Sequence, residues 1–170
     1  MNTMLAAMFE YKAWANTELH SALEAFDVQR YPAQFEAMLR TLDHVSVVDR
    51  IFRGHLIGSA TPFSATQSTQ VPSLSNLKDV VVATDNWYLT YVSKISREDL
   101  KQRLSFVFTD GDRGAMSREE MLMHVIAHGA YHRGGVGQML EDTGICSPPD
   151  SLTKFLHGRE PERRIAVVSE

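Results

Sequence analysis

The chain has one cysteine, no long hydrophobic run and no excess of positive charge, and each shortage excludes a class of protein. Cys146 alone cannot form a disulfide within the chain, which favours a reducing compartment, so we expect the cytoplasm. No stretch approaches the ~20 apolar residues that cross a bilayer. The N-terminus lacks the basic start and cleavage site of a signal peptide. We therefore expect no membrane as partner, and the net charge of −4 leads us to expect no nucleic acid either.

What remains is the composition of a globular protein, with 44% hydrophobic and 22% charged residues. A chain of 170 residues is long enough to bury a core without disulfides or a structural metal. We expect one domain over residues 1–157, followed by a polar tail over 158–170.

Three long helices are expected in the first 95 residues. Residues 3–26 contain neither Gly nor Pro, and their apolar residues recur at helical spacing. Pro32 disfavours helical geometry in Tyr31, so a second helix is expected to begin there and to run to Ile57. The third is expected over 77–95, with Asn76 as its N-cap.

The connections between these helices differ in character. Residues 58–76 are rich in Ser, Thr, Gly and Pro, which predicts a long connection. In 100–116 apolar residues alternate with others before Asp110-Gly111, a strong turn signal, and this predicts a short β-hairpin. Ser117 with Glu120 forms a capping box that opens a fourth long helix, expected to end near Thr143-Gly144.

A short C-terminal helix is expected around residues 151–157. The sequence therefore predicts an all-α protein: a four-helix bundle with a long crossover connection and a short β-hairpin before the last long helix. Bundles of this kind commonly hold metal ions between their helices.

Histidines at 124, 128 and 132 lie four residues apart on the last long helix. Residues i and i+4 of a helix are about 40° and 6 Å apart, so two neighbours could share one ion, whereas His124 and His132 are about 12 Å apart. On a helical wheel His128 and His132 are the more inward pair. His124 faces away, either as a residue that supports the ligands or as a surface residue. The alternative is that the three form only the solvated edge of a helix.

Two imidazoles do not complete a site, because catalytic zinc takes three protein ligands and leaves one position open. His20, His44 and His55 are candidates for the third ligand, and helical spacing does not choose among them. The apolar residues that flank His44 favour it modestly, since burying it without a partner would be costly. The HExxH motif of zinc proteases is absent, so their catalytic glutamate is missing too.

Several segments resemble the DinB family, within the wider DinB/YfiT-like group of metalloenzymes. They include YKAWAN at 11–16, LDH at 42–44, the Asp110-Gly111 turn and HGAYHRG at 128–134. The resemblance covers nearly the whole chain and implies a four-helix bundle, a homodimer in many cases, and one divalent metal bound by His44, His128 and His132. Gly135 stands where the family often has Gln.

In the wider group the metal is zinc or nickel, and some members resemble transferases or isomerases that use a low-molecular-weight thiol. We therefore expect a metal-dependent hydrolase or thiol S-transferase acting on a small-molecule substrate, with catalytic residues unassigned. Asp43, Asp49 and Tyr131 are candidates for supporting the ligands, and Arg133 for pairing with a carboxylate or holding an anion. The alternatives are a non-catalytic, metal-stabilised, stress-associated module and a metal-free bundle that binds a partner.

Overall fold

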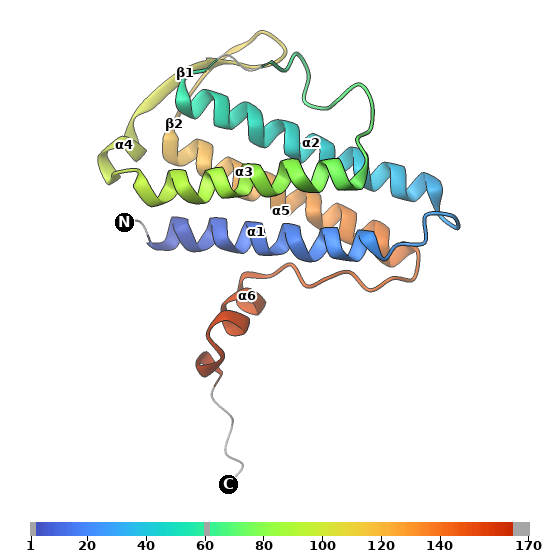
Figure 1. Ribbon diagram of the computed structural model, residues 1–170. Helices are drawn as coiled ribbons and strands as arrows, with labels where there is room; N and C mark the ends of the chain where they lie inside the picture. Colours follow the sequence, from blue (N-terminus) through green and yellow to red (C-terminus); the bar gives the residue numbers. More distant parts are fainter. Residues whose placement is uncertain (1–2, 60–61, 165–170) are drawn as a thin grey trace.

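Four long helices lie side by side in the computed structural model, which describes residues 3–59 and 62–164 (Figure 1). Their bounds are Thr3–Glu24 (α1), Pro32–Ile57 (α2), Leu74–Lys94 (α3) and Arg118–Asp142 (α5). The predicted four-helix bundle is confirmed. Residues 165–170 of the predicted tail lie outside the described ranges.

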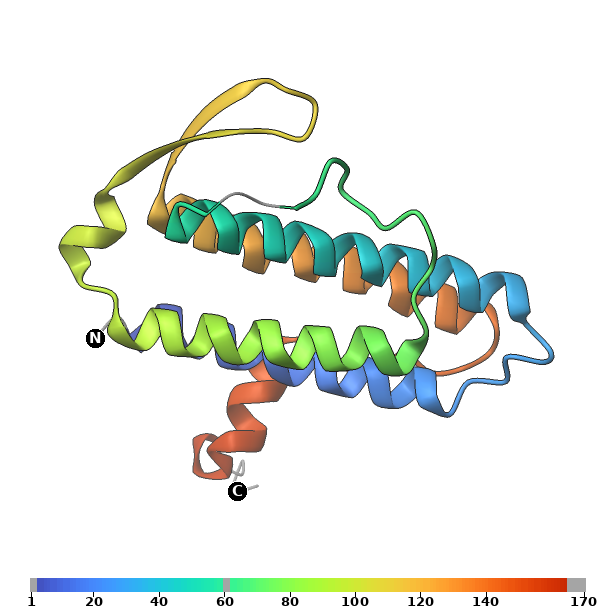
Figure 2. The ribbon, with the colours of Figure 1, turned by 45° about the horizontal axis from the view of Figure 1, so that its top comes forward.

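The helices form two layers, α2 packed on α5 and α1 packed on α3 (Figure 2). Both α2 and α3 run in the same direction, so the connection between them returns along the length of the bundle (Figure 1). This is the predicted crossover. No helix in the described part of the chain is long and apolar enough to cross a bilayer.

Capping side chains explain where α5 and α3 begin. At the start of α5, Ser117 Oγ accepts from the Glu120 backbone N–H and Glu120 Oε2 accepts from the Ser117 N–H, which confirms the capping box. The predicted cap of α3 is wrong, because Ser73 and not Asn76 occupies that position. The Ser73 hydroxyl accepts from the Asn76 N–H at 3.2 Å, so the helix begins three residues earlier.

The predicted hairpin is present as β1 (Arg103–Val107) and β2 (Arg113–Ser117), joined through the Asp110-Gly111 turn. Gly111 has φ 96°, a left-handed conformation that glycine adopts without steric cost. A one-turn helix that we did not predict, α4 (Arg97–Lys101), precedes the hairpin, and the Ser96 hydroxyl caps it. The buried Phe106 of β1 anchors the hairpin on α2.

The C-terminal segment returns along the bundle to α6 (Leu152–Arg159), the predicted short helix, and a 3₁₀ turn follows over Pro161–Arg163 (Figure 1). The Phe155 ring of α6 lies 5.7 Å from the Trp14 ring of α1. Asp150, just before α6, accepts from the Tyr11 hydroxyl and from Arg133. The segment is therefore attached to both α1 and α5.

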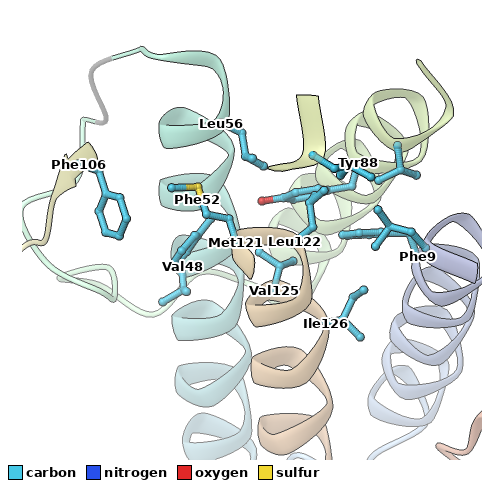
Figure 3. Close-up of a cluster of buried hydrophobic side chains, with 13 residues drawn as sticks. Phe9, Val48, Phe52, Leu56, Tyr88, Phe106, Met121, Leu122, Val125 and Ile126 are labelled. Atoms are coloured by element: carbon cyan, nitrogen blue, oxygen red, sulfur yellow. The ribbon is translucent and has the colours of Figure 1, made fainter. Parts of the chain in front are cut away.

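The buried apolar side chains form two clusters, one toward each end of the bundle. The cluster nearer the hairpin, shown in Figure 3, contains Leu5, Phe9, Val48, Phe52, Leu56, Tyr88, Val92, Leu100, Phe106, Met121, Leu122, Val125 and Ile126. The cluster at the other end contains Leu19, Leu23, Phe26, Met38, Leu39, Leu42, Leu77, Val136 and Leu140. On every long helix, the positions between the two clusters include a buried polar residue.

Buried polar residues near the boundary of the two clusters form a charged layer, which we define as Lys12, Asn16, Asp49, Asp85 and Arg133. Lys12 is 1% exposed, and its Nζ lies 2.6 Å from an oxygen of Asp85 and 2.8 Å from one of Asp49. Asn16 Nδ2 donates to the other oxygen of Asp85 at 2.7 Å. Burial disfavours the charged form of Lys12, but the two carboxylates outweigh it and raise the pKa of this amine. The layer therefore ties α1 to α2 and α3 through ionic hydrogen bonds.

Candidate metal centre

Three histidines meet where α2 packs on α5, at the level of the charged layer. His44 comes from α2, and His128 and His132 come from α5. Each ring offers one nitrogen, and these nitrogens all lie within 4.8 Å of one another. The Nε2 atoms of His44 and His128 are 3.1 Å apart. In the described part of the chain, this is the only group of three or more His, Cys, Asp or Glu residues close enough to share an ion.

The helix period explains how α5 presents its two rings. Val125 and Gly129 are buried on one side of the helix, and Ala127 and Tyr131 are exposed on the other. The histidines fall between these two sides and are half-buried. At Gly129 a Cβ would come within 3.2 Å of Arg133 Nη1 and 3.5 Å of Lys12 Cε. The missing side chain thus lets the charged layer approach α5 directly behind the histidines.

The hydrogen bonds of His44 establish which nitrogen faces the cluster. Its Nδ1 lies 2.8 Å from the carbonyl oxygen of Thr66. A carbonyl only accepts, so Nδ1 carries the proton and Nε2 directs a lone pair toward His128. Nδ1 of His128 is buried and has no hydrogen-bond partner in the described residues. The arrangement therefore turns Nε2 of both rings inward.

The surroundings keep two of these rings neutral. Burial, reinforced by the neighbouring His132, His44, His124 and Lys12, lowers the pKa of His128 to about 3. Burial and the neighbouring His44 also lower the pKa of His132. Metal ligation requires the unprotonated imidazole, so neither ring has to lose a proton at neutral pH.

The residues present fit a divalent metal ion. Around a tetrahedral ion with bonds of ~2.1 Å, neighbouring ligand nitrogens lie about 3.4 Å apart. The Nε2 atoms of His44 and His128, 3.1 Å apart, are close to that separation. The other pairs of ligand nitrogens are no more than 4.8 Å apart. Imidazole suits zinc, nickel, copper and iron, so the ligand set does not choose the metal.

The other histidines considered from the sequence lie elsewhere. His20 is buried in α1. The ring of His55 stacks on Phe106 at 4.6 Å, and burial lowers the pKa of this histidine. His124 does not face away from α2, but it does lie beside a proposed ligand, which is one of the two roles expected for it. Its ring lies 4.5 Å from Phe52 on α2 and stacks on His128 at 5.3 Å. The packing of α2 and α5, which a wheel of one helix omits, covers this side chain.

The residues that were candidates for supporting the ligands or for pairing with a carboxylate also lie in different places. Arg133 pairs with a carboxylate, as expected, since its Nε lies 2.7 Å from an oxygen of Asp150. Asp49 pairs with Lys12, whose Nζ lies 2.8 Å from one of its oxygens. Tyr131 is 79% exposed, although its ring lies edge-on to His132 at 5.1 Å. Asp43 instead contacts the long connection that follows α2.

Sequence reasoning missed the charged layer and the part of the connection that contacts His44. A signal for the layer was present in α1, where Lys12 and Asn16 occupy the apolar stripe between Phe9 and Leu19. A lysine at such a position must find a carboxylate partner if the helix is buried. No sequence signal marked the Thr66 carbonyl, because a backbone acceptor is independent of residue type.

Acidification is expected to destabilise the fold through His20. Its Nδ1 donates to the Asn16 carbonyl at 2.8 Å, its Nε2 has no partner in the described residues, and burial lowers its pKa. In the unfolded chain the pKa of a histidine is near 6.5, so below that pH the unfolded chain binds a proton at His20 more readily than the folded chain does. The stability that neutral His20 contributes is complete above about pH 6.5 and is lost as the pH falls below it.

The measurement is the free energy of urea unfolding of metal-free protein between pH 7.5 and 5. The His20→Gln variant should lose less stability per pH unit than the wild type, by at most ~1.4 kcal/mol. The difference between the two proteins at pH 7.5 reports the changes in packing and in the hydrogen bond to the Asn16 carbonyl. If the free energy of unfolding changed equally with pH in both proteins, the loss of stability could not be assigned to His20.

A helical bundle with a histidine cluster between two of its helices is the class that fold and site define. The sequence profile of the DinB family matches residues 1–164, and the chain belongs to this family. It is 22% identical to Protein DinB of Bacillus subtilis (strain 168) over 173 residues, covering 96% of this chain and 99% of the relative.

A crystal structure of a DinB-like protein from Bacillus cereus ATCC 10987 has the same fold. The TM-score is 0.54 at 16% sequence identity, and the match covers 84% of this chain and 94% of the other. The family assignment agrees with the resemblance found in the sequence.

Proposed function

We propose that this protein binds one divalent metal ion through His44, His128 and His132 and uses it in catalysis on a small molecule. One observation carries the proposal: ligand nitrogens from two helices lie within 4.8 Å of one another. Membership of the DinB family, together with the resemblance to a metal-binding group, is consistent with it.

The three imidazoles and the ion would have different roles in such a site. Three imidazoles would occupy three positions and leave one open for water or substrate. When bound, the ion would lower the pKa of a coordinated water or thiol and so supply a nucleophile at neutral pH. Among the described residues the cluster contains no cysteine, since Cys146 is exposed in the connection after α5.

The expected metal and reaction class come from the family resemblance, because the ligand set by itself does not choose the metal. Zinc or nickel is the expected metal, and the expected reaction is hydrolysis or thiol S-transfer with a low-molecular-weight thiol. The exposed Tyr131 beside His132 is available to contact a substrate. Homodimerisation, which the family resemblance implies, stays a prediction.

Metal analysis of protein purified without an affinity tag tests the proposal. We expect one zinc or nickel ion per chain, removable by a chelator and restored by titration. Metal at trace level only, with no binding on titration, would contradict the site and favour the metal-free partner-binding alternative.

Catalysis needs a separate test. Metal-loaded and metal-free protein should be compared on a panel of thiol adducts and small amides. Turnover by the loaded form alone would support the enzyme. If the loaded form binds one ion per chain, gains thermal stability and turns over nothing, the bound ion joins α2 to α5 as a structural element.

A further inference from the structure

We propose that Asp43 is a positioning residue for His44, acting through the part of the connection that contains Thr66 and Ser68. The proposal rests on the metal site proposed above. It assigns a role to part of the segment 58–76, for which the sequence predicted only a long connection.

Asp43 is adjacent to His44 on α2 and is only 4% exposed. One of its oxygens accepts from the Ser68 backbone N–H at 2.7 Å, and the other accepts from the Ser68 hydroxyl at 2.8 Å. A buried carboxylate that accepts two hydrogen bonds from one residue holds that residue in a defined place. Ser68 is thereby fixed against α2.

Two residues earlier, the carbonyl of Thr66 accepts the Nδ1 proton of His44 at 2.8 Å. This bond selects the tautomer with a free lone pair on Nε2 and restrains rotation of the ring. Groups that orient a histidine ligand in this way affect metal affinity by 10- to 100-fold. Asp43 thus supports His44 indirectly, because it places the segment that holds the carbonyl.

The other residues of the connection offer few further ways to attach it to the helices. Residues 58–73 contain no charged side chain, so an ion pair with α2 or α5 is not available to them. A second contact lies on the other side of Thr66, where the guanidinium of Arg50 stands 4.7 Å from the centre of the Phe63 ring. The Thr66 carbonyl therefore lies between two attachments to α2.

A competing explanation is that the negative charge of Asp43 attracts the cation directly. Asparagine separates the two, because its Oδ1 can still accept the Ser68 N–H while its Nδ2 donates to the Ser68 hydroxyl oxygen. D43N thus removes the charge and keeps both bonds. D43A removes both bonds, and D43N combined with S68A removes the charge and the hydroxyl bond.

Zinc affinity, measured by competition titration, should fall about tenfold or more in D43A. It should stay within about threefold of the wild type in D43N. It should fall by the same intermediate factor in S68A and in D43N/S68A, because both lose only the hydroxyl bond. V47A, which truncates another buried side chain of α2, is the matched control and should bind zinc like the wild type. An equal loss in D43N and D43A would overturn the proposal in favour of direct attraction.

The second readout needs no metal. Nitrogen NMR of the metal-free protein should show the His44 proton on Nδ1 in the wild type and in D43N, and on a mixture of both nitrogens in D43A. This result would support the positioning role even if the wild type bound no zinc, whereas zinc binding with an unchanged tautomer and affinity in D43A would refute it. If D43A does not fold, S68A and D43N/S68A carry the test.

Discussion

Replacing His132 with alanine is expected to lower the affinity for a divalent ion at least tenfold. The ring of His132 lies 4.8 Å from that of His44 and 4.5 Å from that of His128, so its removal leaves two ligands. Loss of a direct ligand should cost at least as much as loss of a group that only orients one, which is 10- to 100-fold. Metal titration and metal analysis of purified protein measure the change.

Two other histidines provide the controls. His157, on α6, is not part of the cluster, and His157→Ala should keep the wild-type affinity. His124→Ala removes a ring that stacks on His128 but belongs to no ligand set, so one ion per chain should still bind. Unchanged affinity and stoichiometry in His132→Ala would exclude this residue as a ligand.

Replacing Lys12 with methionine is expected to lower the free energy of unfolding by about 3–5 kcal/mol. Methionine matches the length of the side chain but leaves Asp49 and Asp85 buried together without their cation. For a chain of this size the melting temperature should fall by roughly 10 °C, at about 2–4 °C per kcal/mol. Urea and thermal unfolding measure both quantities.

Lys154→Met, at an exposed position of α6, is the matched control and should change stability by less than about 0.5 kcal/mol. Replacing Lys12, Asp49 and Asp85 together by apolar residues of similar volume should recover much of the loss, since no charge would remain unpaired. If the free energy of unfolding of Lys12→Met stayed within about 1 kcal/mol of the wild-type value, Lys12 and its two carboxylates would be solvated rather than buried.

Local signals were sufficient for most of the fold. The capping box of Ser117 and Glu120 and the Asp110-Gly111 turn each act within a few residues, and both were predicted correctly. The start of α3 was misplaced because Ser73 and Asn76 can both cap a helix, and the choice depends on which backbone N–H reaches the oxygen. The single turn α4 contains too few residues to show a period.

The site was predictable to the extent that one helix determines it. The spacing of His128 and His132 places both rings on one face of α5, whatever surrounds that helix. Periodicity left His20, His44 and His55 open as the third ligand, and the family resemblance indicated His44. Which ring approaches depends on how α2 lies against α5, and that is a property of packing.

Patterns of period 3.6, caps and turns thus established the helices, the hairpin and the pair of imidazoles on α5, because these depend on neighbours along the chain. Packing decided three other features: the approach of His44, the burial of Lys12 between two carboxylates, and the Thr66 carbonyl that orients the His44 ring. Each of them joins residues more than twenty positions apart. Contacts at that separation follow from the arrangement of the helices in space, which no local pattern specifies.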